Sequence, residues 1–112
     1  METCTFTFPH ERLDAYGVAV EVARRVRRLR WPARSASIRD QAVRASASVV
    51  LNIAEGVGRG PGDARVNHHR IALGSAAEVH AALAVVDIDA RDAYELDQLL
   101  RRLGAMLTSM TR

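Results

Sequence analysis

Apolar residues recur at helical spacing along four successive segments of the chain, and this pattern constrains the fold more than any other feature. The first segment has its apolar residues three or four positions apart, at Leu13, Tyr16, Val20, Ala23, Val26 and Leu29. The second has Ile38, Ala42, Ala45, Val49 and Ile53; the third has Ala72, Ala76, Val79, Leu83 and Val86; the fourth has Leu96, Leu100, Leu103, Leu107 and Met110. This spacing places apolar side chains on one face of an α-helix. The sequence therefore predicts an all-α protein.

Proline, glycine and capping residues between these segments predict where the helices begin and end. We expect helices at about residues 11–30, 38–56, 63–89 and 92–110, in a single domain spanning residues 11–112. An N-terminal arm of residues 1–10, with Phe6 and Phe8 as candidate anchors, precedes them. The expected helix stops and caps are Trp31-Pro32 after the first helix, the capping-box-like pair Ser37 and Asp40, Asp63 before the third, and Asp89 or Asp92 before the fourth.

Chain length and composition favour one compact bundle. The chain has 112 residues, of which 48% are apolar and only 4% aromatic, so small aliphatic side chains must fill one core. The second segment carries a further apolar stripe at Val43, Ala47, Val50 and Ala54, which is typical of an inner helix. Short connections make successive helices antiparallel, and we expect an up-down-up-down four-helix bundle.

The charge distribution and cysteine count limit the classes of function. All 16 basic residues are Arg, and the formal net charge is +3. Residues 1–62 hold ten Arg against six acidic residues, whereas residues 63–112 hold six Arg against seven. This basic half is a hint of an anionic partner. The single cysteine, Cys4, excludes an intrachain disulfide and a Cys-based zinc site. We recognise neither a signal peptide nor a membrane span, so we expect a soluble cytoplasmic protein without a membrane partner.

The stretch SVVLNIAEGVGRGPG, at residues 48–62, resembles a phosphate-binding loop because its glycines alternate. The dinucleotide-binding pattern needs glycine at relative positions 1, 3 and 6. The sixth position is Pro61 when counted from Gly56 and Asp63 when counted from Gly58, so both registers fail. The P-loop pattern requires a lysine, which the chain lacks. We therefore interpret these glycines as the stop and turn between two helices.

Polar residues in the same stretch lie on one narrow helical face. Ser48, Asn52, Glu55 and Arg59 occupy positions i, i+4, i+7 and i+11. An antiparallel pair turning near residue 60 places Asn52 and Glu55 opposite residues 65–69, and Ser48 opposite residues 72–75. We expect Glu55 to pair with Arg59 and with Arg65 or His68. Such a buried polar contact would fix which helices pair and in what register.

A metal centre is an alternative use of these residue types. Bundle di-iron sites take inward-facing glutamates together with Glu-x-x-His motifs, and Glu55, His68 and Glu78 supply some of those groups. No glutamate is followed by a histidine three residues later, and neighbouring His68 and His69 face different directions on a helix. We expect two surface or interface histidines and no metal or other cofactor.

Gly74 stands inside the third predicted helix, where glycine costs about 1 kcal/mol relative to alanine. Gly74, Ala77, Ala81 and Ala84 lie on one face, which would let another helix approach closely. That helix could belong to the same bundle or to another subunit.

An arginine-rich run, RRVRRLRWPAR at residues 24–34, is the strongest candidate for ligand binding. Clustered cations neutralise phosphates, and Trp31 could stack on a base. The candidate nucleic-acid-binding residues are Arg24, Arg25, Arg27, Arg28, Arg30, Trp31 and Arg34. The alternative is that the cations complement a helix C-terminus or form a solvated face, while Trp31 covers the core.

Several of these motifs together resemble a known family. Ser48, NIAEG at residues 52–56, Gly58-Arg59, GSAAE at residues 74–78 and the opening ERLDAYGVAVEV are similar to small bacterial four-helix-bundle proteins encoded in intervening sequences of 23S ribosomal RNA genes. The same family includes the accessory variability determinant of diversity-generating retroelements. The residues that match its motifs are Ser48, Asn52, Glu55, Gly56, Arg59, Gly74, Ser75 and Glu78.

The resemblance implies an antiparallel four-helix bundle that assembles into a ring-shaped homopentamer without catalytic activity. In the retroelement branch it also implies a basic surface that binds nucleic acid and a reverse transcriptase. This chain departs from that branch in its modest charge of +3. The leading hypothesis is a non-enzymatic oligomeric scaffold that binds RNA or DNA through its Arg-rich surface. A protein–protein adaptor and a metal-dependent enzyme are the alternatives.

Overall fold

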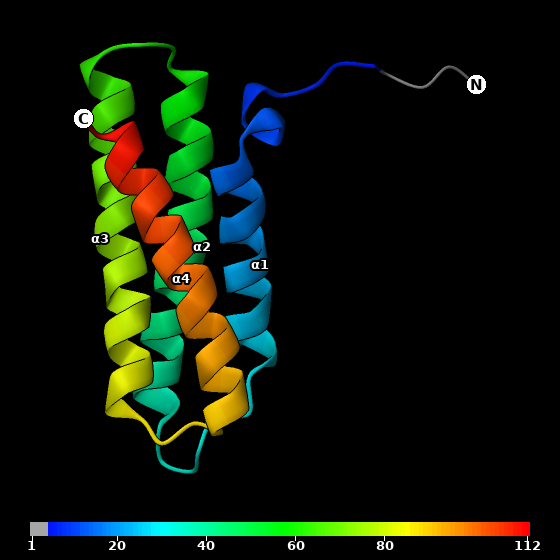
Figure 1. Cartoon of the computed structure of the whole chain (residues 1–112), viewed down its shortest axis with the longest axis vertical. Coiled ribbons are helices and arrows are strands. Elements are labelled where there is room, and N and C mark those ends of the chain that lie inside the picture. Colours follow the sequence, from blue (N-terminus) through cyan, green and yellow to red (C-terminus); the bar gives the residue numbers. More distant parts are fainter. Residues whose placement is uncertain (1–4) are drawn as a thin grey trace.

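The computed structural model describes residues 5–112 and confirms the predicted all-α four-helix bundle (Figure 1). A short 3-10 helix, η1 (Pro9–Arg12), precedes α1 (Asp14–Arg28), α2 (Ala36–Gly58), α3 (Asp63–Val85) and α4 (Ala90–Met110). Successive helices are antiparallel, and each packs against two neighbours: α1 and α3 both contact α2 and α4. The most extensive contact joins α2 and α3, which carry the NIAEG and GSAAE motifs.

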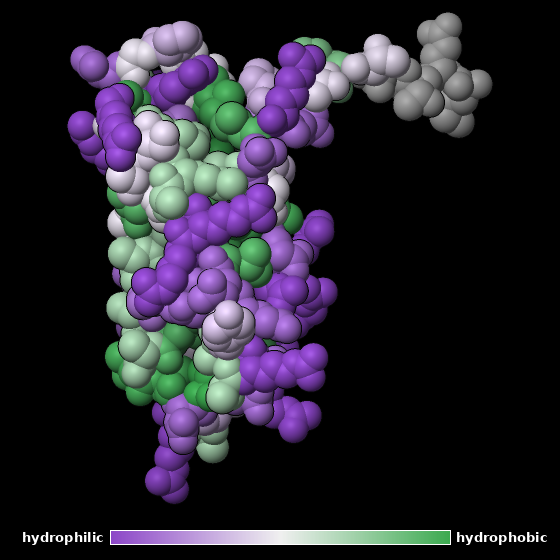
Figure 2. All heavy atoms as spheres, in the orientation of Figure 1, coloured by the Kyte–Doolittle hydropathy of each residue, from purple (hydrophilic) through white to green (hydrophobic). Residues whose placement is uncertain are grey.

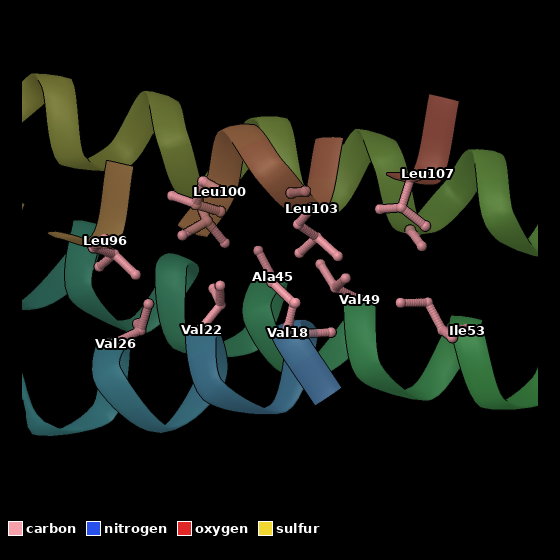
Figure 3. Close-up of a cluster of buried hydrophobic side chains, with 14 of the residues drawn as sticks. Val18, Val22, Val26, Ala45, Val49, Ile53, Leu96, Leu100, Leu103 and Leu107 are labelled. Atoms are coloured by element: carbon pink, nitrogen blue, oxygen red, sulfur yellow. The ribbon is translucent and has the colours of Figure 1, made fainter. Parts of the chain in front are cut away.

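Small aliphatic side chains fill the core, as the scarcity of aromatic residues requires. Leucines of α4 face valines of α1 and the apolar side of α2 (Figure 3). Full burial of each such side chain contributes about 1.5–3 kcal/mol. The labelled core residues are Val18, Val22, Val26, Ala45, Val49, Ile53, Leu96, Leu100, Leu103 and Leu107. Among residues 5–112, none of the helices combines the length and the apolar character needed to cross a bilayer.

The end of α1 differs from the prediction because a side chain closes it early. The helix stops at Arg28, and Leu29 is already extended with a ψ of 142°. The indole N–H of Trp31 donates to the backbone oxygen of Val26 over 3.0 Å, which satisfies a carbonyl of the last turn. The predicted helix end near residue 30 is therefore about two residues too late.

The start of α2 also differs from the prediction. The helix begins at Ala36 with Ser35 as its N-cap, so the proposed capping box of Ser37 and Asp40 is wrong. The Ser35 hydroxyl donates to the backbone oxygen of Pro32 over 2.6 Å rather than accepting from the first turn of the helix.

Of the predicted helix caps, the one for α4 is confirmed and the one for α3 is wrong. Asp63 is the first residue of α3, and Gly62 is its N-cap with a φ of 133°, a conformation that favours glycine. The helix ends at Val85, four residues before the predicted end. Asp89 caps α4, because its carboxylate accepts from the backbone N–H groups of Arg91 at 3.0 Å and Asp92 at 3.4 Å.

The predicted N-terminal arm is described from Thr5 onward, and its first four residues, including Cys4, lie outside the described part. Thr5–Phe8 leaves the bundle beside the start of α1 and projects away from it (Figure 1). Phe6 and Phe8 are 67% and 56% exposed, so neither ring anchors the arm to its own core.

Candidate functional site

Arg25 forms two ion pairs, one within α1 and one that joins α1 to α4. Its Nε lies 2.8 Å from Glu21, one turn earlier, and its Nη1 lies 2.8 Å from Glu95 of α4. The hydrogen bonds that Arg25 donates, first to Glu95 and then to Glu21, raise its pKa above its already high ordinary value. Arg28 also approaches Glu21, at 3.9 Å. The charges of two of the arginines predicted to contact phosphate are therefore partly neutralised within the bundle.

Arg30 and Trp31 lie in an acidic groove at the end of the bundle. The groove is lined by Arg30, Trp31, Pro32 and Ala33 on one side and by Asp87, Asp89 and Asp92 on the other. Trp31 is half-buried against the core, and its N–H already donates to Val26. Trp31 therefore covers the core. The three aspartates across the groove from Arg30 repel a phosphate.

We use the name basic strip for four exposed arginines of α1, the following loop and α2: Arg24, Arg27, Arg34 and Arg44. All four side chains are exposed, and within residues 5–112 none of them forms an ion pair. Arg24 and Arg27 are three residues apart on α1 and share one side of it. Figure 2 shows hydrophilic side chains spread over the face formed by α1 and α4.

Arg44 belongs to the basic strip although sequence reasoning missed it. Between Glu21 and Glu55 the chain has eight arginines and a single acidic residue, Asp40, which Arg39 approaches at 3.4 Å. Arg44 lies outside the contiguous Arg-rich run, but the antiparallel contact of α1 and α2 brings its part of α2 beside α1. The pairing of the two helices was the signal that could have identified it.

A polar network joins α2 to α3 in the register predicted from the sequence. Ser75 donates to the hydroxyl of Ser48 over 3.0 Å, and the Asn52 amide nitrogen donates to the Ser48 backbone oxygen over 2.9 Å and to its hydroxyl over 3.1 Å. Asn52 Oδ1 lies 3.0 Å from Nδ1 of His68. Because the amide nitrogen already donates to a carbonyl, Oδ1 must accept, and His68 therefore carries its proton on Nδ1. The network consists of Ser48, Asn52, His68 and Ser75.

Glu55 lies beside this network rather than in it. Its carboxylate pairs with Arg59 at 2.8 Å, as predicted, and this hydrogen bond lowers the pKa of Glu55. Both side chains are about half-exposed, at 52% and 55%, so the pair is a surface contact. Arg65 donates instead to the backbone oxygen of Val57 over 3.2 Å.

Gly56 and His69 form a close contact between α2 and α3. His69 is only 2% exposed and lies inside the bundle, which corrects the expectation of two surface or interface histidines. A Cβ atom at Gly56 would lie 2.9 Å from two atoms of the His69 ring, so only glycine fits there. Burial, and then the charge of Arg65, lower the pKa of His69. The signal was available, since His69 continues the buried stripe of Ala72 and Ala76.

The glycine-alanine face of α3 points out of the bundle. Gly74, Ala77, Ala81 and Ala84 are all exposed, and the space beside Gly74 is open. The interpretation as tight packing inside the bundle is therefore wrong, and a contact with another subunit stays a prediction. Glu78 is exposed beside this face.

The residues of the metal-centre alternative are not gathered into one site. Glu55 is bound by Arg59, and His68 is bound by Asn52. In the described part of the chain, no group of three or more His, Cys, Asp or Glu side chains is placed to hold a metal ion. A histidine–carboxylate contact, between His80 of α3 and Asp97 of α4 at 2.8 Å, joins two helices and was not predicted.

A comparison with protein families shows which family the chain belongs to. The model of a family described as 23S rRNA-intervening sequence protein matches residues 11–109. The chain belongs to this family. A search of curated protein sequences gave no match.

In this member of the 23S rRNA-intervening sequence protein family, four of the eight motif residues serve the contact between α2 and α3. Ser48, Asn52 and Ser75 form the polar network, and Gly56 admits the ring of His69. Arg59 neutralises Glu55 at the turn between the helices, while Gly74 and Glu78 face outward. The inward-facing motif residues thus set the pairing of two helices, and the basic strip lies outside the motifs.

Proposed function

We propose that the protein is a non-enzymatic scaffold that self-associates and binds the phosphate backbone of RNA or DNA through the basic strip. The observation that carries this proposal is the set of four exposed arginines, Arg24, Arg27, Arg34 and Arg44, without a carboxylate partner in the described chain. Guanidinium groups form bidentate contacts with phosphates, and backbone contacts of this kind need no base recognition.

Self-association supports the proposal because one basic strip is small. Four arginines on a chain of net charge +3 give weak binding at physiological salt. Several copies in one assembly repeat the strip along the same polyanion, and linked sites bind more tightly than separate ones. We propose a homo-oligomer, with the pentameric ring of related proteins as its expected form.

The test is a titration of labelled single-stranded RNA and duplex DNA with two charge-matched triple variants. Arg24→Ala/Arg27→Ala/Arg44→Ala removes three members of the basic strip. Arg70→Ala/Arg101→Ala/Arg112→Ala removes the same charge from exposed positions elsewhere. We expect affinity to fall at least about tenfold in the first variant and much less in the second. Equal losses would show that only net charge matters, and no binding by the wild type would refute the proposal.

A protein–protein adaptor is the second candidate. Leu51 is 67% exposed on α2 and Ile71 is 44% exposed on α3, which is unusual for large aliphatic residues in a charged surface. In the retroelement setting the partner would be a reverse transcriptase. Co-purification of such an enzyme that survives loss of the basic strip would favour this candidate.

A further inference from the structure

The chain places both of its phenylalanines on the arm and none in its core. Phe6 and Phe8 are the only two, and they are 67% and 56% exposed. Their rings contact each other edge to face, with centroids 5.0 Å apart. Burial of an aromatic ring contributes more than burial of the alanines and valines that fill this core. The two rings therefore offer apolar area that the bundle of their own chain leaves uncovered.

Hydrogen bonds and ring contacts hold the base of the arm against the start of α1. Phe8 accepts a backbone hydrogen bond from Glu11 at 3.0 Å and donates its own N–H to the Glu11 carboxylate at 2.8 Å. The Phe8 ring stacks on His10, which in turn contacts Tyr16 of α1. This ladder holds the arm at the start of α1, from where it projects away from the bundle (Figure 1).

An apolar surface of matching character lies on the α2–α3 side. Leu51 lies between Ser48 and Asn52, and Ile71 lies between His68 and Ser75. Because the polar network joins those flanking residues across the two helices, Leu51 and Ile71 are at the same level of the bundle. We call these two residues and the exposed face around them the Leu51–Ile71 surface.

Leu51 and Ile71 are uncharged, as are residues 5–8 of the arm, whereas Arg70 precedes Ile71 in the chain and Glu55 lines the groove beside Leu51. The surrounding network has no carboxylate or arginine, and the nearby Glu55 and Arg59 neutralise each other. The α1–α4 face differs, because docking there would desolvate charges such as Arg25 and Glu95. An uncharged aromatic segment therefore desolvates fewer charges on the Leu51–Ile71 surface than on the α1–α4 face.

We propose that Phe6 and Phe8 of one copy cover the Leu51–Ile71 surface of a second copy. A groove whose lining includes Phe8, Leu51 and Glu55 runs from the root of the arm to that surface. Phe8 lies at the edge of this groove in its own chain, yet Phe6, Phe8 and Leu51 all stay more than half exposed, and the arm before Phe8 projects away from the bundle (Figure 1). A second copy supplies a Leu51–Ile71 surface for the rings of the first copy, and rings for the Leu51–Ile71 surface of the first copy. The inference rests on the self-association proposed above and is independent of nucleic-acid binding.

Light scattering and sedimentation of the full chain test the arm directly. Phe6→Ala/Phe8→Ala and Leu51→Ala/Ile71→Ala should each weaken self-association at least about tenfold. Tyr94→Ala removes a side chain that is 65% exposed on α4, and it should leave the assembly unchanged. Each variant changes exposed residues, and circular dichroism checks that its helix content is retained. An assembly that is unaffected by the arm variant would overturn the proposal.

Cross-linking distinguishes docking on a second copy from closure on the same chain. In a Cys4→Ser background, Phe6→Cys and Ile71→Cys variants are mixed, and we expect a disulfide-linked dimer of the two chains. A cross-link that forms only within the chain of a Phe6→Cys/Ile71→Cys variant would contradict the proposal. A monomeric wild type would also overturn it. The charge-matched arginine variants would still report nucleic-acid binding, so the two proposals fail separately.

Discussion

Replacing Gly56 with alanine tests whether the α2–α3 contact requires the absence of a side chain. The added Cβ atom would lie 2.9 Å from Cδ2 and Nε2 of His69 and 3.1 Å from the backbone oxygen of Arg65. Carbon atoms pack best at about 3.5–4.0 Å, and His69 is 2% exposed, so the ring has little room to retreat. Overpacking costs about 1–3 kcal/mol, whereas alanine in place of a helical glycine gains at most about 1 kcal/mol. We expect a net loss of about 1–2 kcal/mol in the free energy of unfolding.

Urea denaturation at a fixed protein concentration measures this loss. Far-ultraviolet circular dichroism reports all helices, and the single tryptophan, Trp31, reports the opposite end of the bundle. Gly104→Ala is the matched control, because the space beside Gly104 in α4 is open, and it should stabilise by up to about 1 kcal/mol. In a His69→Ala background, Gly56→Ala should no longer destabilise. A Gly56→Ala variant as stable as Gly104→Ala would refute the reasoning.

Three further predictions concern other contacts. Because the folded-state pKa of His69 lies below its ordinary 6.5, the unfolded chain takes up this proton first, and stability should fall as pH drops below 6.5, by at most about 1.4 kcal/mol per pH unit. His69→Leu should remove that part of the slope in pH-dependent urea titrations. Asn52→Ala should cost about 1–2 kcal/mol, because it removes the hydrogen bonds from Asn52 to Ser48 and leaves Nδ1 of His68 without its partner; an unchanged unfolding midpoint would contradict the network. Glu95→Gln should tighten RNA binding in a fluorescence titration, since it frees Arg25; weaker binding would argue against a phosphate role for this face.

The sequence was sufficient to predict the helices and the register of α2 against α3. Apolar spacing of three and four residues fixes which side of each helix is buried, and it needs no knowledge of the partner helix. The polar positions of Ser48 and Asn52 then required partners, and the antiparallel turn near residue 60 left few candidates. In the structure, Ser75 is the partner of Ser48 and His68 is the partner of Asn52.

Contacts between residues far apart in the sequence could not be predicted in the same way. Arg25 looked like a free cation until α4 placed Glu95 beside it, 70 residues later. The first turn of α2 depended on how Trp31 and Pro32 close the preceding loop, so the local Ser37–Asp40 pattern misplaced the cap. Which arginines remain unpaired is a property of the packed helices, and the Arg-rich run alone did not reveal it.

The salt dependence of RNA binding tests the proposed function most directly. For single strands, log K changes with log salt concentration by about −0.7 per neutralised phosphate, so four arginines of the basic strip predict a slope of about −3 per bound subunit. The Arg24→Ala/Arg27→Ala/Arg44→Ala variant should reduce this slope to about −1, while the Arg70→Ala/Arg101→Ala/Arg112→Ala variant should keep it near −3. A wild-type slope near zero, or the same slope in both variants, would contradict the assignment of the basic strip as the nucleic-acid interface.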